Sequence, residues 1–373
     1  MPTIIVGAGI IGVSSAYYLS ELDPSKAHDI HLVESSPELF ASASGFAAGF
    51  LAADWFSSPL AKLGALSFKL HMDIAETNNG QERWGYSQST GTNLAETIES
   101  NEDRDSDWLR EGASRARAAA NTEPESGNAP QWLKSKGALD VLSGGDTTAQ
   151  ILVIAAGAWS PSVFRTLFPT SKLSIPITSL SGHSLLLRSK HWPPPALDAT
   201  DPIRGLSSSP SIPVHHRKDN ERQCHAIFTT DTQGGYSPEL FSRMPNGEIY
   251  LAGLNSPSYP LPKVANERTV DSAAINTLKV TARRLLGDDV EVVRESVCWR
   301  PVSRRGVPVI CELTGKVGDK GNKDGSDEGG GEGVFLAAGH GAWGISLSLG
   351  TGWCVARMVA GEDMSEYVGR LGI

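Results

Sequence analysis

Cysteine is scarce in this chain of 373 residues, and no two cysteines lie close together in the sequence. The four are Cys224, Cys298, Cys311 and Cys354, and none belongs to a CxxC motif. This spacing favours neither a zinc site nor a dense disulfide framework. We therefore expect no bound metal and a reducing compartment.

Long apolar runs and an excess of positive charge are also missing. No uninterrupted apolar stretch is long enough to span a bilayer, and the first one, TIIVGAGIIGV, contains glycines and follows no basic region, unlike a signal peptide. The 42 acidic and 33 basic residues give a formal charge of −9, which disfavours binding to nucleic acid or anionic lipid. We expect a cytoplasmic protein without a membrane span or a nucleic-acid partner, whose ligands are small molecules. The oligomeric state is not indicated.

What the chain does contain begins with a strand–turn–helix–strand unit. Apolar β-branched runs at 3–6 and 29–34 flank a stretch with helical apolar spacing at 9–22. The turn carries the motif GAGIIG, whose first glycine permits the tight turn, whose second lets the backbone approach a pyrophosphate, and whose third lets helix and strand pack closely. The helix N-terminus would then face the phosphates with its positive dipole end.

An acidic residue completes this pattern, because Glu34 ends the second strand 22 residues after Gly12, where a carboxylate binds a ribose. The alternative is a purely structural glycine turn. At this point the unit indicates a dinucleotide but does not choose between NAD and FAD. The predicted contacts of this end of the ligand are Gly7, Ala8, Gly9, Ile10, Ile11, Gly12, Glu34 and Ser35.

Two segments rich in small residues bear on that choice. In FASASGFAAGFLAADW, residues 40–55, Ser42 and Ser44 could donate hydrogen bonds to a phosphate or ribitol, and the alanines and glycine at 47–49 let the backbone run against a flat ring. Alone, this would be an ordinary loop. A second run of small residues, AAGAW at 155–159, follows a buried strand. The two runs together favour a site for a flat ring more than either does alone.

The rest of the chain divides into parts by the spacing of its apolar residues. Helical spacing is expected at 59–76, 160–167, 267–286 and 347–359, and one exposed helix around 105–120 within the polar stretch 77–130, which otherwise reads as loops. From about 171, strands are expected in LSIPITSLSGHSLLLRS, CHAIFTTDT, GEIYLAGL and at 291–297. Residues 314–333 have almost no core-forming side chains and read as a disordered surface loop.

Four separated blocks carry a resemblance to a known family: the N-terminal unit, the serine-rich loop after Glu34, VIAAGAWSP, and GHGAWGISLSLGTG at 339–352. The chain resembles the D-amino-acid oxidase and glycine oxidase superfamily of FAD-dependent oxidoreductases, which also contains sarcosine oxidase. With SPELFSRMPNGEIYLAG, it is most similar to a poorly characterised, mainly fungal branch.

The resemblance implies an α/β fold with a Rossmann-like FAD-binding domain, discontinuous in sequence, and a second domain built on an antiparallel sheet. It places the domains at 1–76, 146–170 and 296–373 for FAD, and at 77–145 and 171–295 for the substrate. The flavin would lie between the backbone at 47–51 and the glycine loop at 339–345. Further cofactor contacts would be Ser42, Ser44, Ala48, Gly49, Leu51, Ala156, Gly157, Trp159, Gly339, Gly341, Ala342, Gly344 and Ile345.

The implied reaction is oxidation of the C–N bond of an amino acid or secondary amine by hydride transfer to flavin, with O₂ as the acceptor that reoxidises it. Arg300 matches an arginine that holds the substrate carboxylate, and the alternative for it is a structural ion pair. Cys298 lies where sarcosine-oxidase-like members attach flavin covalently, although a buried apolar cysteine is commoner. His340 and Trp343 are expected to line the ring or gate oxygen, or else to serve packing alone.

One departure from the family concerns the segment before residue 151, which is too short for the helix and two strands that normally stand there. This shortening puts adenine binding, part of the substrate pocket and activity itself in question. Two alternatives stay open beside the flavoenzyme. The shortened segment favours one of them, a catalytically impaired FAD-binding protein with an interaction or trafficking role. The other is an NAD(P)-dependent dehydrogenase.

Overall fold

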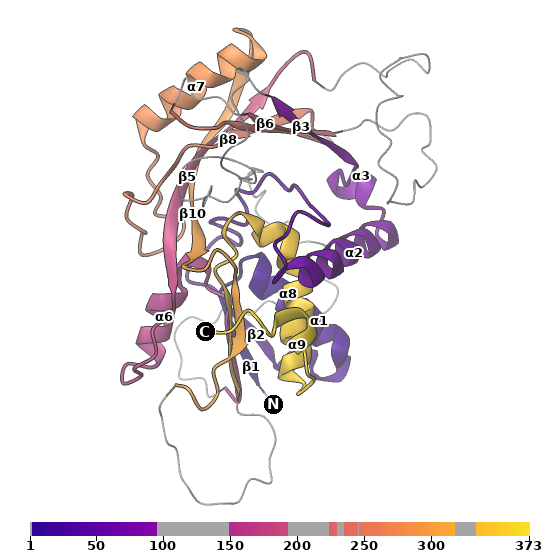
Figure 1. Ribbon diagram of the computed structural model, residues 1–373, viewed down its shortest axis with the longest axis vertical. Helices are drawn as coiled ribbons and strands as arrows, with labels where there is room; N and C mark the ends of the chain where they lie inside the picture. The colour runs from indigo at the N-terminus through magenta and orange to yellow at the C-terminus, as the bar shows by residue number, and fades with distance from the viewer. Residues whose placement is uncertain (1, 95–148, 193–223, 230–234, 245, 318–332) are drawn as a thin grey trace, which may run out of the picture.

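The computed structural model describes residues 2–94, 149–192, 224–229, 235–244, 246–317 and 333–373. The expected helix around 105–120, the shortened segment and most of the 314–333 loop lie outside the described residues. Figure 1 shows two sheets, one above the other, with α7 over the upper sheet and the other long helices around the lower one.

The lower sheet, sheet A, carries the N-terminal unit. Its strands are β1 (Thr3–Val6), β2 (Ile30–Val33), β4 (Ile151–Ile154), β11 (Val309–Glu312) and β12 (Gly333–Ala338). They lie in the order β11-β12-β4-β1-β2. All neighbours are parallel except β11 and β12, which form an antiparallel pair at one edge. The carboxyl ends of β1 and β4 therefore lie side by side, where a doubly wound sheet binds its ligand.

Helices cover both faces of sheet A. On one face lie α1 (Ile10–Leu22), α2 (Ala61–Thr77), α8 (Gly344–Val359) and the short α9 (Ser365–Val368). On the other face lies α6 (Ser160–Leu167), which follows the 3-10 turn η2 (Gly157–Trp159). The first core packs the alternate strand residues Ile5 and Val153 against Leu63 of α2 and Leu347 of α8. The second core packs Ile154 and its neighbours around Phe164 of α6. A 3-10 turn, η1 (Pro24–Asp29), leads into β2.

The upper sheet, sheet B, follows the path β10-β5-β8-β7-β6-β3. Its strands are β3 (Ser89–Leu94), β5 (Ile177–Arg188), β6 (Cys224–Thr229), β7 (Glu239–Arg243), β8 (Glu248–Ala252), β9 (Asn255–Ser256), which pairs with β5, and β10 (Glu291–Ser303). Every pair is antiparallel except β3 with β6. The outer face packs on α7 (Ser272–Leu286), and α3 (Gly80–Trp84) precedes β3.

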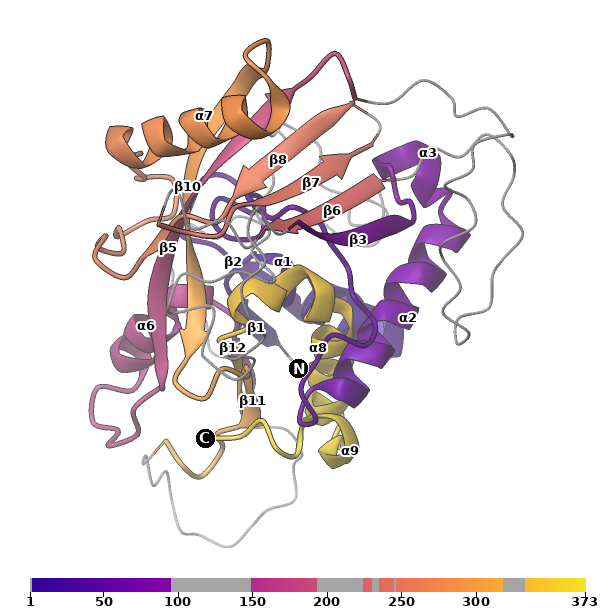
Figure 2. The ribbon, with the colours of Figure 1, turned by 45° about the horizontal axis from the view of Figure 1, so that its top comes forward.

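The two sheets are joined through the long strands β5 and β10. Figure 2 shows both strands running from sheet B down toward sheet A. At their lower ends Val302 of β10 bridges to His340, which follows β12, and Ile177 of β5 belongs to the core around Phe164. The long strands of sheet B therefore reach sheet A, and they are joined to it by a main-chain bridge and by the core around Phe164.

The predicted fold class is confirmed, with several differences in its elements. The helix expected from 267 begins at Ser272, because Asp271 caps it by accepting a hydrogen bond from the Ala274 amide. Strand β10 continues past 297 to Ser303, and α8 starts at Gly344 rather than 347. Five strands were not among the expected ones: β3, β7, β9, β11 and β12. The sequence of β3, STGTNL, lacks an apolar alternation. The proposed domain boundaries stay a prediction.

Candidate functional site

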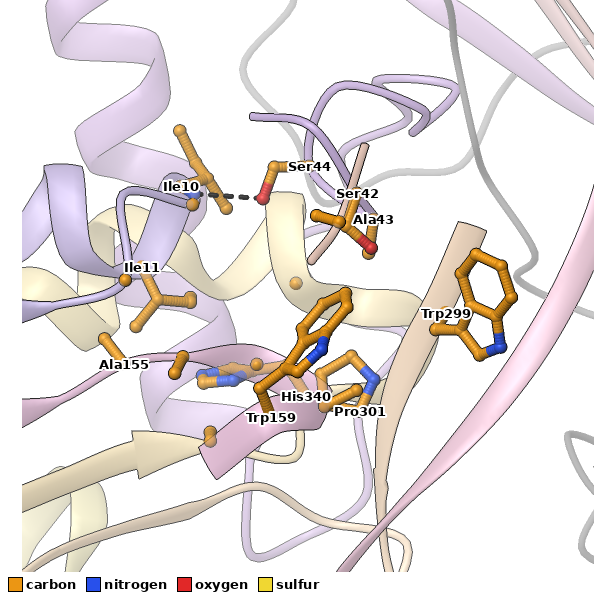
Figure 3. A pocket seen from close by; sticks show the side chains of 18 of the residues that line it. Ile10, Ile11, Ser42, Ala43, Ser44, Ala155, Trp159, Trp299, Pro301 and His340 are labelled. Carbon is orange, nitrogen blue, oxygen red and sulfur yellow. Dashed lines mark hydrogen bonds between the residues drawn. The ribbon is translucent and has the colours of Figure 1, made fainter. Parts of the chain in front are cut away.

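A cavity of about 550 Å³ lies between sheet A and the lower ends of the long strands. Its walls come from segments far apart in the sequence: the glycine turn, the serine-rich loop, the end of β4, β10 and the start of α8. Figure 3 shows Ile10 and Ile11 at one end of the cavity, Trp299 at the other, and Trp159, His340 and Pro301 between them. The fold thus brings the four sequence blocks to one site.

The glycine turn at the first end leaves no room for side chains. A Cβ on Gly12 would lie 1.9 Å from the Gly7 carbonyl oxygen, and one on Gly7, whose φ is +108°, would lie 2.6 Å from the Ala155 carbonyl oxygen. Helix α1 therefore packs directly on β1 and β4, with its N-terminal amides at the cavity. Such amides bind phosphate groups well.

Two side chains already engage amides of this turn. Glu34 accepts a hydrogen bond from the Ala8 amide at 2.9 Å, and Ser44 accepts one from the Ile10 amide at 2.9 Å, as drawn in Figure 3. The Ser44 hydroxyl keeps its own proton to donate. The buried hydroxyl of Ser42, which also lines the cavity, has no partner among the described residues. This end therefore offers hydroxyl and amide donors to a ligand.

The serine-rich loop is fastened to the start of α8. Ser346 Oγ accepts a hydrogen bond from the Ala52 amide at 3.0 Å and lies 3.3 Å from the Ala52 carbonyl oxygen. At the same end of the helix, Nε2 of His71 in α2 lies 3.0 Å from the Ile345 carbonyl oxygen. Burial lowers the pKa of His71 to about 4, against the opposing effect of that hydrogen bond, so the ring is neutral and Nε2 carries the proton. His71 was not predicted as a site residue, because helical spacing indicates only which face of α2 is buried.

His340 lies inside the wall of the cavity and is 4% exposed. Its Nε2 is 3.1 Å from the Thr351 hydroxyl, and its Nδ1 has no partner among the described residues. Burial lowers its pKa to about 3, so this histidine is neutral at physiological pH. Trp343 lies elsewhere: its ring packs edge-on against Phe56 with centroids 4.8 Å apart, and it is not among the cavity-lining residues.

Arg300 is the largest fully buried side chain of the described residues, at 2% exposure. It lines the cavity from β10, and its Nη1 donates to Asn255 Oδ1 at 2.9 Å. Its Nη2 has no partner, and no ion pair involves Arg300 among the described residues. The structural ion pair considered for this residue is thus not found there. A buried guanidinium without a carboxylate is costly, which points to an anionic ligand.

Cys298 lies two residues before Arg300 in the apolar cluster between sheet B and the serine-rich loop, against residues such as Phe46 and Tyr250. Its side chain is 1% exposed and is not among the cavity-lining residues. Burial raises the pKa of its thiol, against the opposing charge of Arg300, which disfavours the reactive thiolate.

The cavity gathers most of the predicted site residues but not all. Those that line it are Gly7, Gly9, Ile10, Ile11, Glu34, Ser35, Ser42, Ser44, Ala156, Gly157, Trp159, Arg300, His340, Gly341, Ala342, Gly344 and Ile345. The predicted residues that are not among the lining residues are Ala8, Gly12, Ala48, Gly49, Leu51, Cys298, Gly339 and Trp343. Residues that line it without having been predicted include Phe40, Lys263, Ala265 and Trp299. Trp299 was missed because its strand was expected to end at 297.

A family model described as FAD dependent oxidoreductase matches residues 3–140 and 131–358 of the chain. The chain belongs to this family. The Schizosaccharomyces pombe protein called "Putative oxidoreductase" is 24% identical over 384 residues, covering 95% of this chain and 93% of that one. FAD is therefore the cofactor of this oxidoreductase, and the NAD(P)-dependent alternative is dropped.

Solved structures of other proteins share the fold. Glycine oxidase from Geobacillus kaustophilus is 21% identical, with a TM-score of 0.65 and coverage of 99% of this chain and 97% of that one. L-amino acid deaminase from Proteus myxofaciens is 11% identical, with a TM-score of 0.63 and coverage of 100% and 92%. In the described part of the chain, no helix is long and apolar enough to cross a membrane.

The residues of this cavity fit FAD. The close approach of α1 to β1, which a Cβ on Gly12 would prevent, leaves a backbone cradle for the pyrophosphate, and the unpartnered hydroxyl of Ser42 can serve a ribitol. The start of α8 adds a second helix N-terminus to the wall. Its positive end stabilises negative charge, such as that which a flavin gains on reduction.

Proposed function

We propose that this FAD-dependent oxidoreductase oxidises the C–N bond of an amino acid or secondary amine. When bound, FAD supplies the redox step, because its isoalloxazine accepts a hydride from the carbon that bears the amine. The resulting imine hydrolyses in water, and O₂ is the proposed acceptor that reoxidises the cofactor. The observation that carries this proposal is Arg300, a buried guanidinium at the cavity wall with a free Nη2.

The first role of the chain is to hold the cofactor. We assign the pyrophosphate to the glycine turn and the adenosine ribose to Glu34, which would accept hydrogen bonds from its hydroxyls. The Glu34 carboxylate already accepts from the Ala8 and Ser36 amides, which keeps it oriented toward the turn. Ser42 and Ser44 would donate to the phosphate or ribitol. The backbone at 47–51 and the start of α8 would face the two sides of the ring.

The second role is to orient the substrate. Arg300 would bind a substrate carboxylate, since a guanidinium fork matches two carboxylate oxygens. This binding would fix the amine-bearing carbon relative to the ring, and orientation of this kind is a large part of what such an enzyme contributes.

His340 would donate to or accept from the ring or substrate through Nδ1, and it would do so without charge because of its low pKa. Trp343 would act through packing, by holding Phe56 and the start of α8. Covalent attachment through Cys298 stays a prediction. Precipitation of the purified protein with acid tests it, because only covalent flavin stays with the pellet.

The decisive experiment is anaerobic mixing of the FAD-loaded protein with a panel of amino acids and secondary amines. Bleaching of the flavin absorbance by at least one compound, and loss of that bleaching in Arg300→Leu with FAD retained, is the expected result. Bound flavin that no compound reduces would instead support a non-catalytic FAD-binding protein. Reoxidation by air after bleaching tests the role of O₂.

A further inference from the structure

Arg300 is held by a neutral side chain. Its Nη1 donates to Asn255 Oδ1, and a guanidinium has no acceptor, so the amide must turn its oxygen to the arginine. The amide nitrogen, Asn255 Nδ2, is then a second free donor. Neither Nη2 of the arginine nor Nδ2 of the asparagine has a partner among the described residues, and both atoms are buried.

Asn255 is itself fixed by its strand. In β9 it pairs with Gly182 of β5, and the next residue, Ser256, pairs with Ser181. The Ser181 hydroxyl also donates to the Ser256 carbonyl at 2.7 Å, and the His183 amide donates to the Leu254 carbonyl at 3.0 Å. The amide group therefore extends from a backbone that is anchored on both sides.

Gly182 makes the room in which the two side chains meet. A Cβ at this position would lie 1.9 Å from Arg300 Nη1 and 2.8 Å from Asn255 Oδ1. The guanidinium and the amide thus pass directly over the glycine backbone in the middle of a long strand. A glycine inside a strand often marks such a close approach.

The contact between Arg300 and Asn255 differs from the usual environment of a buried arginine, because the partner is uncharged. Buried arginines are normally paired with carboxylates, which cancel their charge. An aspartate has nearly the same shape as an asparagine and would give an ion pair here, whereas the asparagine orients the guanidinium and leaves its charge available. Among the described residues no ion pair takes its place.

We infer that Asn255 is a positioning residue that holds Arg300 without neutralising it, so that the site selects a carboxylate-bearing amine over a neutral one. This inference rests on the proposed function and narrows its substrate class. It predicts that simple secondary amines without a carboxylate are poor substrates. It also implies that Gly182 is needed because only glycine leaves room for the side chains of Arg300 and Asn255 to meet.

The test compares two substitutions at one position. Asn255→Asp supplies the missing carboxylate, and Asn255→Ala removes the hold but keeps the free charge. Ser256→Ala is the matched control, because it lies next in β9 and its hydroxyl serves only the Ser258 amide among the described residues. Each variant is titrated in the FAD-loaded form with acetate, benzoate and the neutral analogue acetamide, followed by the change in flavin absorbance.

We expect wild-type protein to bind the two carboxylates more tightly than acetamide. Asn255→Asp should weaken carboxylate binding about a hundredfold and leave acetamide within about threefold. Asn255→Ala should weaken carboxylate binding about tenfold, and Ser256→Ala should leave it within about twofold. With an amino-acid substrate, KM should rise by similar factors while kcat changes much less, which a general loss of structure would not produce.

Two outcomes overturn the inference: wild-type affinity for carboxylates in Asn255→Asp with FAD and thermal stability intact, or equal affinity of the wild type for acetate and acetamide. If Asn255→Asp fails to load FAD, Asn255→Ala decides by the same titration. The proposed function can fail separately. A protein that binds carboxylates through Asn255 and Arg300 but whose flavin no amine reduces would keep the inference and lose the reaction.

Discussion

The two ends of the cavity are built from different materials. At the glycine turn the wall is mostly main chain that lacks side chains, and its polar groups are amides, the hydroxyl of Ser44 and the carboxylate of Glu34. At the β10 end the wall is made of large buried side chains, of which Arg300 carries a full charge without a described counter-ion. The backbone of the first end fits the cofactor, whereas the second end presents a positive charge that has no counter-ion among the described residues. A substitution at the first end should therefore reduce FAD binding and stability, whereas one at the second end should reduce substrate binding.

The largest effect is expected from Gly12→Ala. Its Cβ would meet the Gly7 carbonyl at 1.9 Å, so α1 must move away from β1. We expect a loss of about 4 kcal/mol in the free energy of unfolding and no retained FAD. Gly157→Ala is the control, since it also changes a glycine at the cavity, with φ +54° but nothing within 4 Å, and should cost only about 1 kcal/mol. Urea unfolding and flavin content measure both, and equal losses would remove the argument from close packing.

Arg300→Leu should have the opposite signature. We expect kcat/KM for an amino acid to fall about a thousandfold, which corresponds to about 4 kcal/mol. FAD content should stay at the wild-type level. The melting temperature without substrate should hold or rise, because removal of a buried charge that has no counter-ion relieves its desolvation. A variant that loses FAD together with activity would show that the two ends are not separate.

Acid should lower the free energy of unfolding through two buried histidines, His71 and His340. Burial holds the pKa of His71 at about 4 and that of His340 at about 3, whereas both are near 6.5 in the unfolded chain. Below pH 6.5 the unfolded state therefore binds more protons than the folded state. The contribution of the two neutral histidines to stability is present in full above pH 6.5 and is lost as the pH falls toward their pKa values in the folded protein. At pH 5.5 each histidine should cost about 1.4 kcal/mol.

Melting temperatures from pH 7.5 to 5 check this dependence. His71→Gln, which retains a hydrogen-bond donor for the Ile345 carbonyl, should show a shallower decline than the wild type. Parallel declines in the two proteins would mean that His71 does not contribute to the acid sensitivity.

The smallest effect is expected from Ser346→Ala. This change removes the hydroxyl that joins α8 to Ala52 and leaves the helix intact, so about 1 kcal/mol of stability should be lost. The dissociation constant of FAD should rise about threefold, because the loop that we propose to face the ring would be less firmly held. Fluorescence titration of the apo-protein with FAD measures this rise. An unchanged constant would show that the loop is held well enough without this contact.

The sequence by itself determined the first end of the cavity. The positions of Gly7, Gly9 and Gly12 relative to a strand and a helix are local, so spacing alone predicts the turn. The match to the family of FAD-dependent oxidoreductases confirmed that the cofactor is FAD. The fold class followed for the same reason, since apolar periodicity marks strands and helices wherever the core is continuous. Strand β3 was missed because its polar sequence carries no such signal.

The tertiary structure decided the second end. Nothing near Arg300 in the sequence indicates that Asn255 and Gly182, which lie 45 and 118 positions earlier, would meet its guanidinium. Likewise only the packing of α2 against α8 brings His71 to the Ile345 carbonyl, and only the depth of the interior keeps His340 uncharged. A glycine motif determines the local backbone, so it can be recognised in the sequence alone. The charge and partners of a buried side chain depend on residues that meet it only after the chain has folded.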